Sequence, residues 1–140
     1  MIFLAWSALD YKAAYVASGE YDNILSSLRW GADFIFKSNQ LPNALYGQVG
    51  DGNADHAYWG RPEDWPNGPR PVYKLTPQAP GSDIAGNYAA AMAIISAVFA
   101  DSDAAYSARC LAAARQLYDF ANNYRGLSSQ SMPAAAAFYS

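Results

Sequence analysis

Residues 49–65 read VGDGNADHAYWGRPEDW, and this stretch decides how the rest of the chain is interpreted. It contains the single histidine of the protein and two of its four tryptophans. Glycine and proline are frequent in it, so we predict that it is not helical. It lies within residues 38–81, a span that holds seven of the eight prolines and in which the helical period is lost. Irregular loops of this length are usually functional when ordered.

On both sides of this span, apolar residues recur at helical spacing. Tyr21, Ile24 and Leu28, for example, begin one stripe of a core-facing helix. The spacing predicts four helices, at about 1–17, 20–37, 82–99 and 103–124. We predict Ser82 as the capping residue of the third helix and Asp101-Ser102 as the capping pair of the fourth. Alternating long and short connections suggest an all-α toroid whose long loops gather on one face to form a cleft.

Composition excludes several classes of protein. Apolar residues make up 52% of the chain and charged residues 15%, which is the composition of a folded domain. A net charge of −3 with scattered basic residues argues against nucleic acid. We expect no membrane partner, since no apolar stretch reaches the ~20 residues of a span, and the first residues lack the features of a signal peptide.

The composition also argues against a disulfide and against a metal site. Cys110 is the single cysteine, so no internal disulfide forms, and its alanine-rich helical setting predicts a small buried hydrophobe. With no second histidine, any metal site would have to be built from oxygen ligands alone. We therefore predict neither a cofactor nor a metal in this chain.

An acidic and aromatic loop held between helices suits a sugar, because flat rings can stack on pyranose faces while polar groups bond to hydroxyls. His56 and Trp59 are the candidates for such contacts. From the residues alone, a structural hydrogen bond is the default interpretation of His56, and Trp65 is interpreted mainly as packing the loop onto the helices. The whole loop could also be structural, within a helical interaction scaffold.

The sequence of the loop and of the segments around it resembles that of glycoside hydrolase family 9, a family of inverting cellulases that are mostly endo-β-1,4-glucanases. The resemblance runs nearly end to end and in one order. The blocks that carry it are residues 46–52, Asp55-His56, Trp59, residues 61–64, Arg70-Pro71, residues 80–83 and residues 124–126. Residues 28–34 and 116–121 fit the same family.

The resemblance implies a fold, a function and a location. The fold would be part of an (α/α)6 barrel, with residues 1–140 forming a partial catalytic domain that is incomplete at both ends. The complete domain would be secreted and would hydrolyse internal β-1,4-glucosidic bonds of cellulose or β-glucan oligosaccharides by inversion. The family's catalytic Asp-Ala-Gly-Asp motif and its catalytic glutamate are not in this chain. We therefore expect the chain alone to be inactive, and the family's calcium loop to lie outside it.

Three positions match sugar-contacting residues of the family. His56 corresponds to a histidine that hydrogen-bonds hydroxyls near the cleavage point, and Trp59 to a ring that stacks on glucose. Tyr139 corresponds to a tyrosine on the non-reducing side, although an asparagine of that block is missing here. Asn87 stands where relatives usually have glutamate. These three residues are the predicted substrate-binding set, and we predict no catalytic residue.

Two carboxylate pairs, Asp51 with Asp55 and Glu63 with Asp64, invite a catalytic interpretation, because inverting glycosidases need an acid and a base about 6.5–9.5 Å apart. We reject both. Asp51 lies in a tight turn, where its side chain would cap backbone amides, and Glu63-Asp64 follows Pro62 like a capping pair. We expect Arg61 and Arg70 to hold these carboxylates through bidentate contacts. The alternative function is a non-catalytic glucan-binding module or pseudoenzyme.

Overall fold

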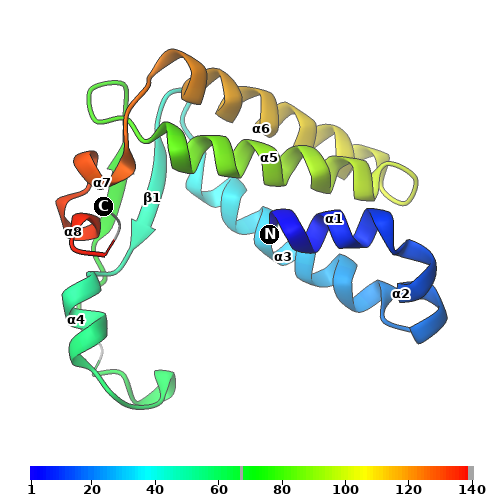
Figure 1. The fold of residues 1–140 in the computed structure, drawn as a ribbon, viewed down its shortest axis with the longest axis horizontal. Helices are drawn as coiled ribbons and strands as arrows, with labels where there is room; N and C mark the ends of the chain where they lie inside the picture. Colours follow the sequence, from blue (N-terminus) through cyan, green and yellow to red (C-terminus); the bar gives the residue numbers. More distant parts are fainter. Residues whose placement is uncertain (67, 139–140) are drawn as a thin grey trace.

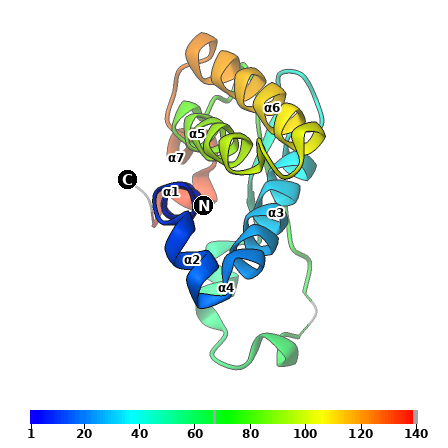
Figure 2. The ribbon, with the colours of Figure 1, turned by 90° about the vertical axis from the view of Figure 1, so that its right-hand side faces the viewer.

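The computed structural model describes residues 1–66 and 68–138. Its long helices form two layers: the pair α5 (Ser82–Phe99) and α6 (Ala104–Asn123) packs over α1 (Ile2–Asp10) and α3 (Tyr21–Ser38) (Figure 1). The short helix α2 (Lys12–Ser18) joins the lower two. A view from the side shows the connection between α3 and α5 extending away from these layers (Figure 2).

The first predicted helix is interrupted. Instead of one helix over 1–17, the chain leaves the helical conformation at Tyr11, with φ −116° and ψ 26°, and resumes as α2. The break lets Ala5 and Ala8 of α1 be fully buried, while α2 has no buried residue. Gly19 closes α2 in the left-handed conformation (φ 77°), which glycine adopts without steric cost, and this end agrees with the prediction.

The helices α3, α5 and α6 form as predicted because their apolar stripes meet in one core. Leu28 of α3, Met92 and Ile95 of α5 and Leu117 of α6 are almost completely buried. The alanines of α5 allow close packing against α6, where Ser107 Oγ donates to the Ser96 carbonyl at 2.7 Å. Cys110 is buried in this layer, as predicted.

By length and hydropathy alone, α5 is the one helix among the described residues that could cross a membrane, which the sequence-based prediction missed. In the fold, 44% of the residues in that window are buried against protein. Its contacts are with α6, α1 and α3, as is usual for a core helix.

The connection from α3 to α5 contains more structure than the irregular loop that the sequence predicted. Strands β1 (Leu45–Val49) and β2 (Val72–Leu75) pair antiparallel, from Leu45 opposite Leu75 to Val49 opposite Val72. The register shifts between Tyr46 and Gln48, as in a bulge. The helix α4 (Gly52–Ala57) and the 3-10 helix η1 (Pro62–Asp64) lie between the strands. No two-residue turn joins these strands, so the sequence lacked the usual hairpin signal.

Leu75 fastens this two-stranded sheet to the helical layers. Its side chain is completely buried. A Cβ placed on Gly47 of β1 would lie 3.0 Å from Leu75 Cδ1, and one placed on Gly81 would lie 2.9 Å from Leu75 Cδ2. The leucine therefore fills the space between the sheet and the start of α5, and the two glycines make room for it.

The start of α5 is tied to the segment after α6. Ser82 is the first residue of α5 rather than its cap; Gly81 precedes the helix, and Ser82 Oγ donates to the Gly126 carbonyl at 3.1 Å. The Asp83 carboxylate accepts hydrogen bonds from Ser128 N at 2.9 Å and from Ser128 Oγ at 2.6 Å. These bonds fix α7 (Ser128–Ser131) and α8 (Pro133–Ala136) beside α5.

A polar cluster joins α3 to α6. The Arg29 guanidinium donates to Asp103 Oδ2 at 2.9 Å and lies 4.0 Å from the centre of the Tyr106 ring. Tyr106 Oη donates to Asp33 Oδ1 at 3.0 Å. Asp103 is also the cap of α6, since its Oδ1 accepts from Tyr106 N. The prediction of Asp101-Ser102 as the capping pair is therefore wrong by one residue.

This cluster and Cys110 predict a loss of stability in alkali. Burial raises the pKa of Cys110 to about 11 from 9.0, and burial followed by the hydrogen bond to Asp33 raises the pKa of Tyr106. Both groups keep their protons in the folded state at a pH where the unfolded chain has lost them. The contribution of Cys110 is therefore complete below about pH 9 and is lost as pH rises to about 11, whereas that of Tyr106 begins to decline only near pH 10, its ordinary pKa. Urea denaturation at pH 8 and pH 10.5 measures it, and Cys110→Ala should show the smaller decline; equal declines would contradict the assignment.

Candidate functional site

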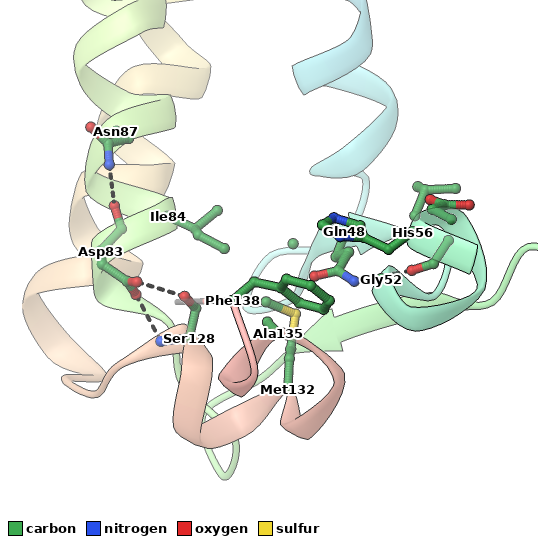
Figure 3. A pocket seen from close by; sticks show the side chains of 14 residues that line it. Gln48, Gly52, His56, Asp83, Ile84, Asn87, Ser128, Met132, Ala135 and Phe138 are labelled. Atoms are coloured by element: carbon green, nitrogen blue, oxygen red, sulfur yellow. Dashed lines mark hydrogen bonds between the residues drawn. The ribbon is translucent and has the colours of Figure 1, made fainter. Parts of the chain in front are cut away.

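A cavity of about 730 Å³ lies where the sheet, α4, the start of α5 and the α7–α8 segment meet (Figure 3). Gln48, Gly52 and His56 line it from β1 and α4, and Asp83, Ile84 and Asn87 line it from α5. Met132, Ala135 and Phe138 close it from the third side. The cavity therefore gathers residues from the first half of the connection (residues 47–56), from the start of α5 and from the segment after α6.

His56 reaches this cavity because α4 is helical, contrary to the prediction that residues 49–65 are not. The Asp51 carboxylate caps the helix, accepting from Ala54 N at 3.0 Å, as predicted for this side chain. One turn later, His56 is exposed and lines the cavity. The position agrees with that of a sugar-contacting residue, and the role itself stays a prediction.

Phe138 lies against His56. The two ring centroids are 4.5 Å apart with an interplanar angle of 46°. Gly52, at the start of α4, permits this contact, because a Cβ there would lie 3.0 Å from Phe138 Cδ2 and closer still to the ring edge. In Figure 3 the Phe138 ring lies between His56 and the α5 side of the cavity.

Trp59 lies apart from His56. It follows the end of α4, is 99% exposed, and is not among the residues that line the cavity. An almost completely exposed indole is available to stack on a ligand, but Trp59 does not line the cavity. Trp65 is half-buried; its ring contacts are with Tyr58 at 5.0 Å, edge to face, and with the Arg70 guanidinium at 5.6 Å. These contacts lie within the connection itself.

The carboxylates near the cavity are engaged by donors from the chain. Asp55 receives two hydrogen bonds from Arg70, each 3.0 Å long, and Asp83 receives the two from Ser128. Asp51 caps α4 and accepts from Tyr73 Oη at 3.3 Å. The pairing of Asp55 with Arg70 is the bidentate contact that was predicted. Both carboxylates of the first rejected pair, Asp51 and Asp55, therefore have structural partners.

The second rejected pair also has a structural setting. Arg61 Nε donates to Asp64 Oδ2 at 2.8 Å, which confirms the predicted partner, but the structure shows one hydrogen bond rather than the predicted bidentate contact. Residues Pro62–Asp64 form the 3-10 helix η1, and no side chain caps it, so the prediction of Glu63-Asp64 as a capping pair is wrong. Both side chains project from the exposed part of the connection.

Two further predictions concern Tyr139 and metals. Tyr139 lies outside the described residues. Within residues 1–66 and 68–138, no group of three or more histidine, cysteine or acidic side chains is arranged to hold a metal ion. The calcium expectation for the complete domain stays a prediction.

Sequence reasoning missed three residues of the cavity. Gln48 lies on the half-buried part of β1, and its Nε2 donates to the Gly50 carbonyl at 3.0 Å. Asn87 lies one turn after Asp83, and its Nδ2 donates to the Asp83 carbonyl. Phe138 is far from His56 in sequence. The contacts of Gln48 and Asn87 are local, but they do not indicate that the two side chains meet at one cavity; only the family blocks around Gly47 and Asp83 could have drawn attention to them.

Comparison with known proteins gives concordant results. The model of the family described as Glycosyl hydrolase family 9 matches residues 1–140. Endoglucanase 15 of Arabidopsis thaliana is 48% identical over 136 residues, which cover 97% of this chain and 27% of that protein. Endoglucanase 20 of Oryza sativa subsp. japonica is 51% identical over 131 residues, covering 93% and 25%. The chain thus spans about a quarter of the length of these curated relatives.

Solved structures agree with the sequence matches. The endoglucanase of the termite Nasutitermes takasagoensis superposes with a TM-score of 0.95 at 47% identity, covering 99% of this chain and 32% of that one. A C. cellulolyticum cellulase in complex with cellobiose superposes with a TM-score of 0.85 at 37% identity, covering 90% and 29%. These matches confirm the all-α fold as part of an (α/α)6 barrel. The chain belongs to glycosyl hydrolase family 9.

Proposed function

We propose that this chain is part of a longer catalytic domain that hydrolyses internal β-1,4-glucosidic bonds of cellulose or related β-glucans. The observation that carries the proposal is the cavity beside α4, into which the exposed imidazole of His56 faces. The relatives named endoglucanases support the reaction, and the neighbour solved with cellobiose supports a glucan ligand. In this proposal residues 1–140 form one part of that domain, and the complete protein is secreted.

In this proposal the chain binds substrate and does not cut it. The imidazole of His56 offers one hydrogen-bond donor and one acceptor to sugar hydroxyls, and its contact with Phe138 fixes the ring. Trp59 extends the site outward as a stacking platform. Tyr139 is proposed as the third contact.

The inverting mechanism is also part of the proposal. Inversion needs a general acid and a general base on opposite faces of the sugar, with room for a water molecule. Among the described residues, the carboxylates that line the cavity are those of Asp55 and Asp83. Their oxygens accept hydrogen bonds from Arg70 and Ser128, respectively. We therefore assign the acid and the base to polypeptide outside residues 1–140.

Substitution of the two described contacts tests the function. In the complete protein, Trp59→Ala should weaken binding of cello-oligosaccharides about five-fold, the equivalent of ~1 kcal/mol for a lost stacking contact. His56→Ala should weaken it about two- to ten-fold, as for one or two net hydrogen bonds. Titration calorimetry measures both dissociation constants.

The control is Leu111→Ala, which removes a partly exposed side chain from α6, far in the chain from the cavity. Its dissociation constant should equal that of the unmodified protein. Thermal melting should change little in all three variants, since each side chain is substantially exposed. Unchanged binding in both His56→Ala and Trp59→Ala would overturn the proposed role of this chain.

A non-catalytic glucan-binding module is the second candidate. The observation that favours it is the engagement of every cavity-lining carboxylate of the described chain by a structural partner. It predicts the same binding results without hydrolysis by the complete protein. Release of reducing ends from carboxymethylcellulose therefore separates the two candidates.

A further inference from the structure

Arg70 makes a two-bond ion pair that crosses the connection. Its Nη1 and Nη2 atoms donate to Asp55 Oδ1 and Oδ2, each at 3.0 Å. Asp55 lies on α4, next to His56, whereas Arg70 lies just before β2. A planar guanidinium facing both oxygens of a carboxylate fixes orientation as well as distance. The pair therefore sets where α4 lies relative to the sheet.

Gly50 is shaped to admit this pair. It has φ 92°, a left-handed conformation that disfavours side chains. A Cβ at this position would lie 2.9 Å from Asp55 Oδ2 and would overlap the Arg70 guanidinium. Gly50 N also donates to the Pro71 carbonyl at 2.8 Å, which holds the backbone beside Arg70. Backbone, glycine and ion pair thus form one close-packed unit.

The same guanidinium has a second contact, with Trp65, which leads through Tyr58 to the turn that carries Trp59. It lies 5.6 Å from the centre of the Trp65 ring, and Trp65 meets Tyr58 edge to face at 5.0 Å. Tyr58 Oη donates to the Arg61 carbonyl, which closes the turn that carries Trp59. Arg70 is therefore the common partner of the helix that bears His56 and of the turn that bears Trp59.

We infer that Arg70 is a positioning residue for substrate binding: through Asp55 it places His56, and through Trp65 and Tyr58 it places Trp59. The inference rests on the proposed function of those two residues. Arg70 is not among the residues that line the cavity, so it acts through its neighbours.

The weak anchoring of α4 makes this role necessary. The helix has six residues and none of them is buried. Isolated helices of that length are unstable in water, so α4 depends on contacts from outside. Contacts with α8 and Phe138, the hydrogen bond from Tyr73 to Asp51 and the Arg70 pair join it to the rest of the described protein. Of these, the Arg70 pair is the one with two charge-assisted hydrogen bonds. The core residues on α3, α5 and α6 are independent of it, so the fold should survive its loss.

The test is a double-mutant cycle in the complete protein, with the dissociation constant of a cello-oligosaccharide as the readout. Arg70→Gln should weaken binding about ten-fold, a loss bounded by the joint contribution of His56 and Trp59. In the His56→Ala, Trp59→Ala background, Arg70→Gln should have almost no further effect, because the residues it positions are gone. Arg70→Lys should recover only part of the affinity, since one ammonium cannot reproduce the bidentate contact.

The matched control is Arg61→Gln, which removes the pair with Asp64 in the same connection but leaves α4 untouched. It should bind as the unmodified protein does. If Arg70→Gln does not fold, Asp55→Asn removes the same ion pair from the other side, and the cycle is repeated with it.

The outcomes separate the two proposals. Equal losses from Arg70→Gln with and without His56 and Trp59 would overturn the positioning role and leave the proposed function intact. Full affinity in Arg70→Gln would do the same. If His56→Ala and Trp59→Ala themselves bind with unchanged affinity, the proposed function is wrong, and the positioning role of Arg70, which rests on it, is wrong as well. Non-additive losses of affinity in the cycle, together with unchanged affinity in Arg61→Gln, support the inference.

Discussion

Replacing Leu75 with alanine is expected to lower the free energy of unfolding of the complete domain by about 2–5 kcal/mol, the range for large-to-small changes in a core. The side chain is completely buried and fills the space between Gly47 and Gly81. Its removal leaves a void where the sheet meets α5, and neither glycine has a side chain with which to fill it. Chemical denaturation followed by tryptophan fluorescence measures the change.

Val72→Ala is the matched control because it shortens a side chain of the same strand. Val72 is 56% exposed, so we expect a loss of less than about 0.5 kcal/mol, as for most surface substitutions. Equal losses in the two variants would show that β2 contributes through its backbone pairing alone, and that the proposed role of Leu75 is wrong.

The isolated 140-residue chain is expected to self-associate. Phe3 is 88% exposed and Trp30 is 82% exposed, and with Phe34 they line an apolar cavity of about 590 Å³ between α1, α3 and α5. Monomeric proteins rarely leave a large contiguous apolar patch open to water. We expect light scattering after size exclusion to show oligomers at micromolar concentration, and the chain to bind hydrophobic dyes.

Substituting the patch should reverse the association. Phe3→Ser with Trp30→Ser should shift the isolated chain toward monomer, because these two rings are the most exposed aromatic side chains of this cavity. Leu111→Ser with Tyr118→Ser on α6 is the control, since both side chains are exposed singly on the far helix. A monomer with low dye binding in the unsubstituted chain would contradict the prediction.

The long helices were predictable because their residues face a common core. Ile24 and Leu28 recur at the helical period and are buried, and the alanines of α5 form a closely packed layer as expected. The break at Tyr11 was not predictable from the same period. It arises because α1 packs on α5, which is distant in the sequence, while α2 contacts α3.

The candidate site was predicted in its residues but not in its geometry. His56, the Asp51 cap and the Arg70–Asp55 pair were recognised from the loop itself, because polar residues beside glycine signal local hydrogen bonds. The helix α4 was missed because a six-residue segment that begins with glycine has little intrinsic helicity. It is also held by contacts with α8 and Phe138, which are distant in the sequence and which no local pattern connects to it.

The two sides of the cavity are held in different ways. On one side, Asp83 and Ser128 lock α5 to α7 through short bonds to a buried serine. On the other, a short helix rests on an ion pair whose side chains are 38% and 45% exposed. If the α4 side of the cavity moves outward while the α5 side stays fixed, the cavity widens and the core is not disturbed. We therefore expect bulkier, substituted polysaccharide backbones to be accommodated by outward displacement of α4, with α5 remaining in place.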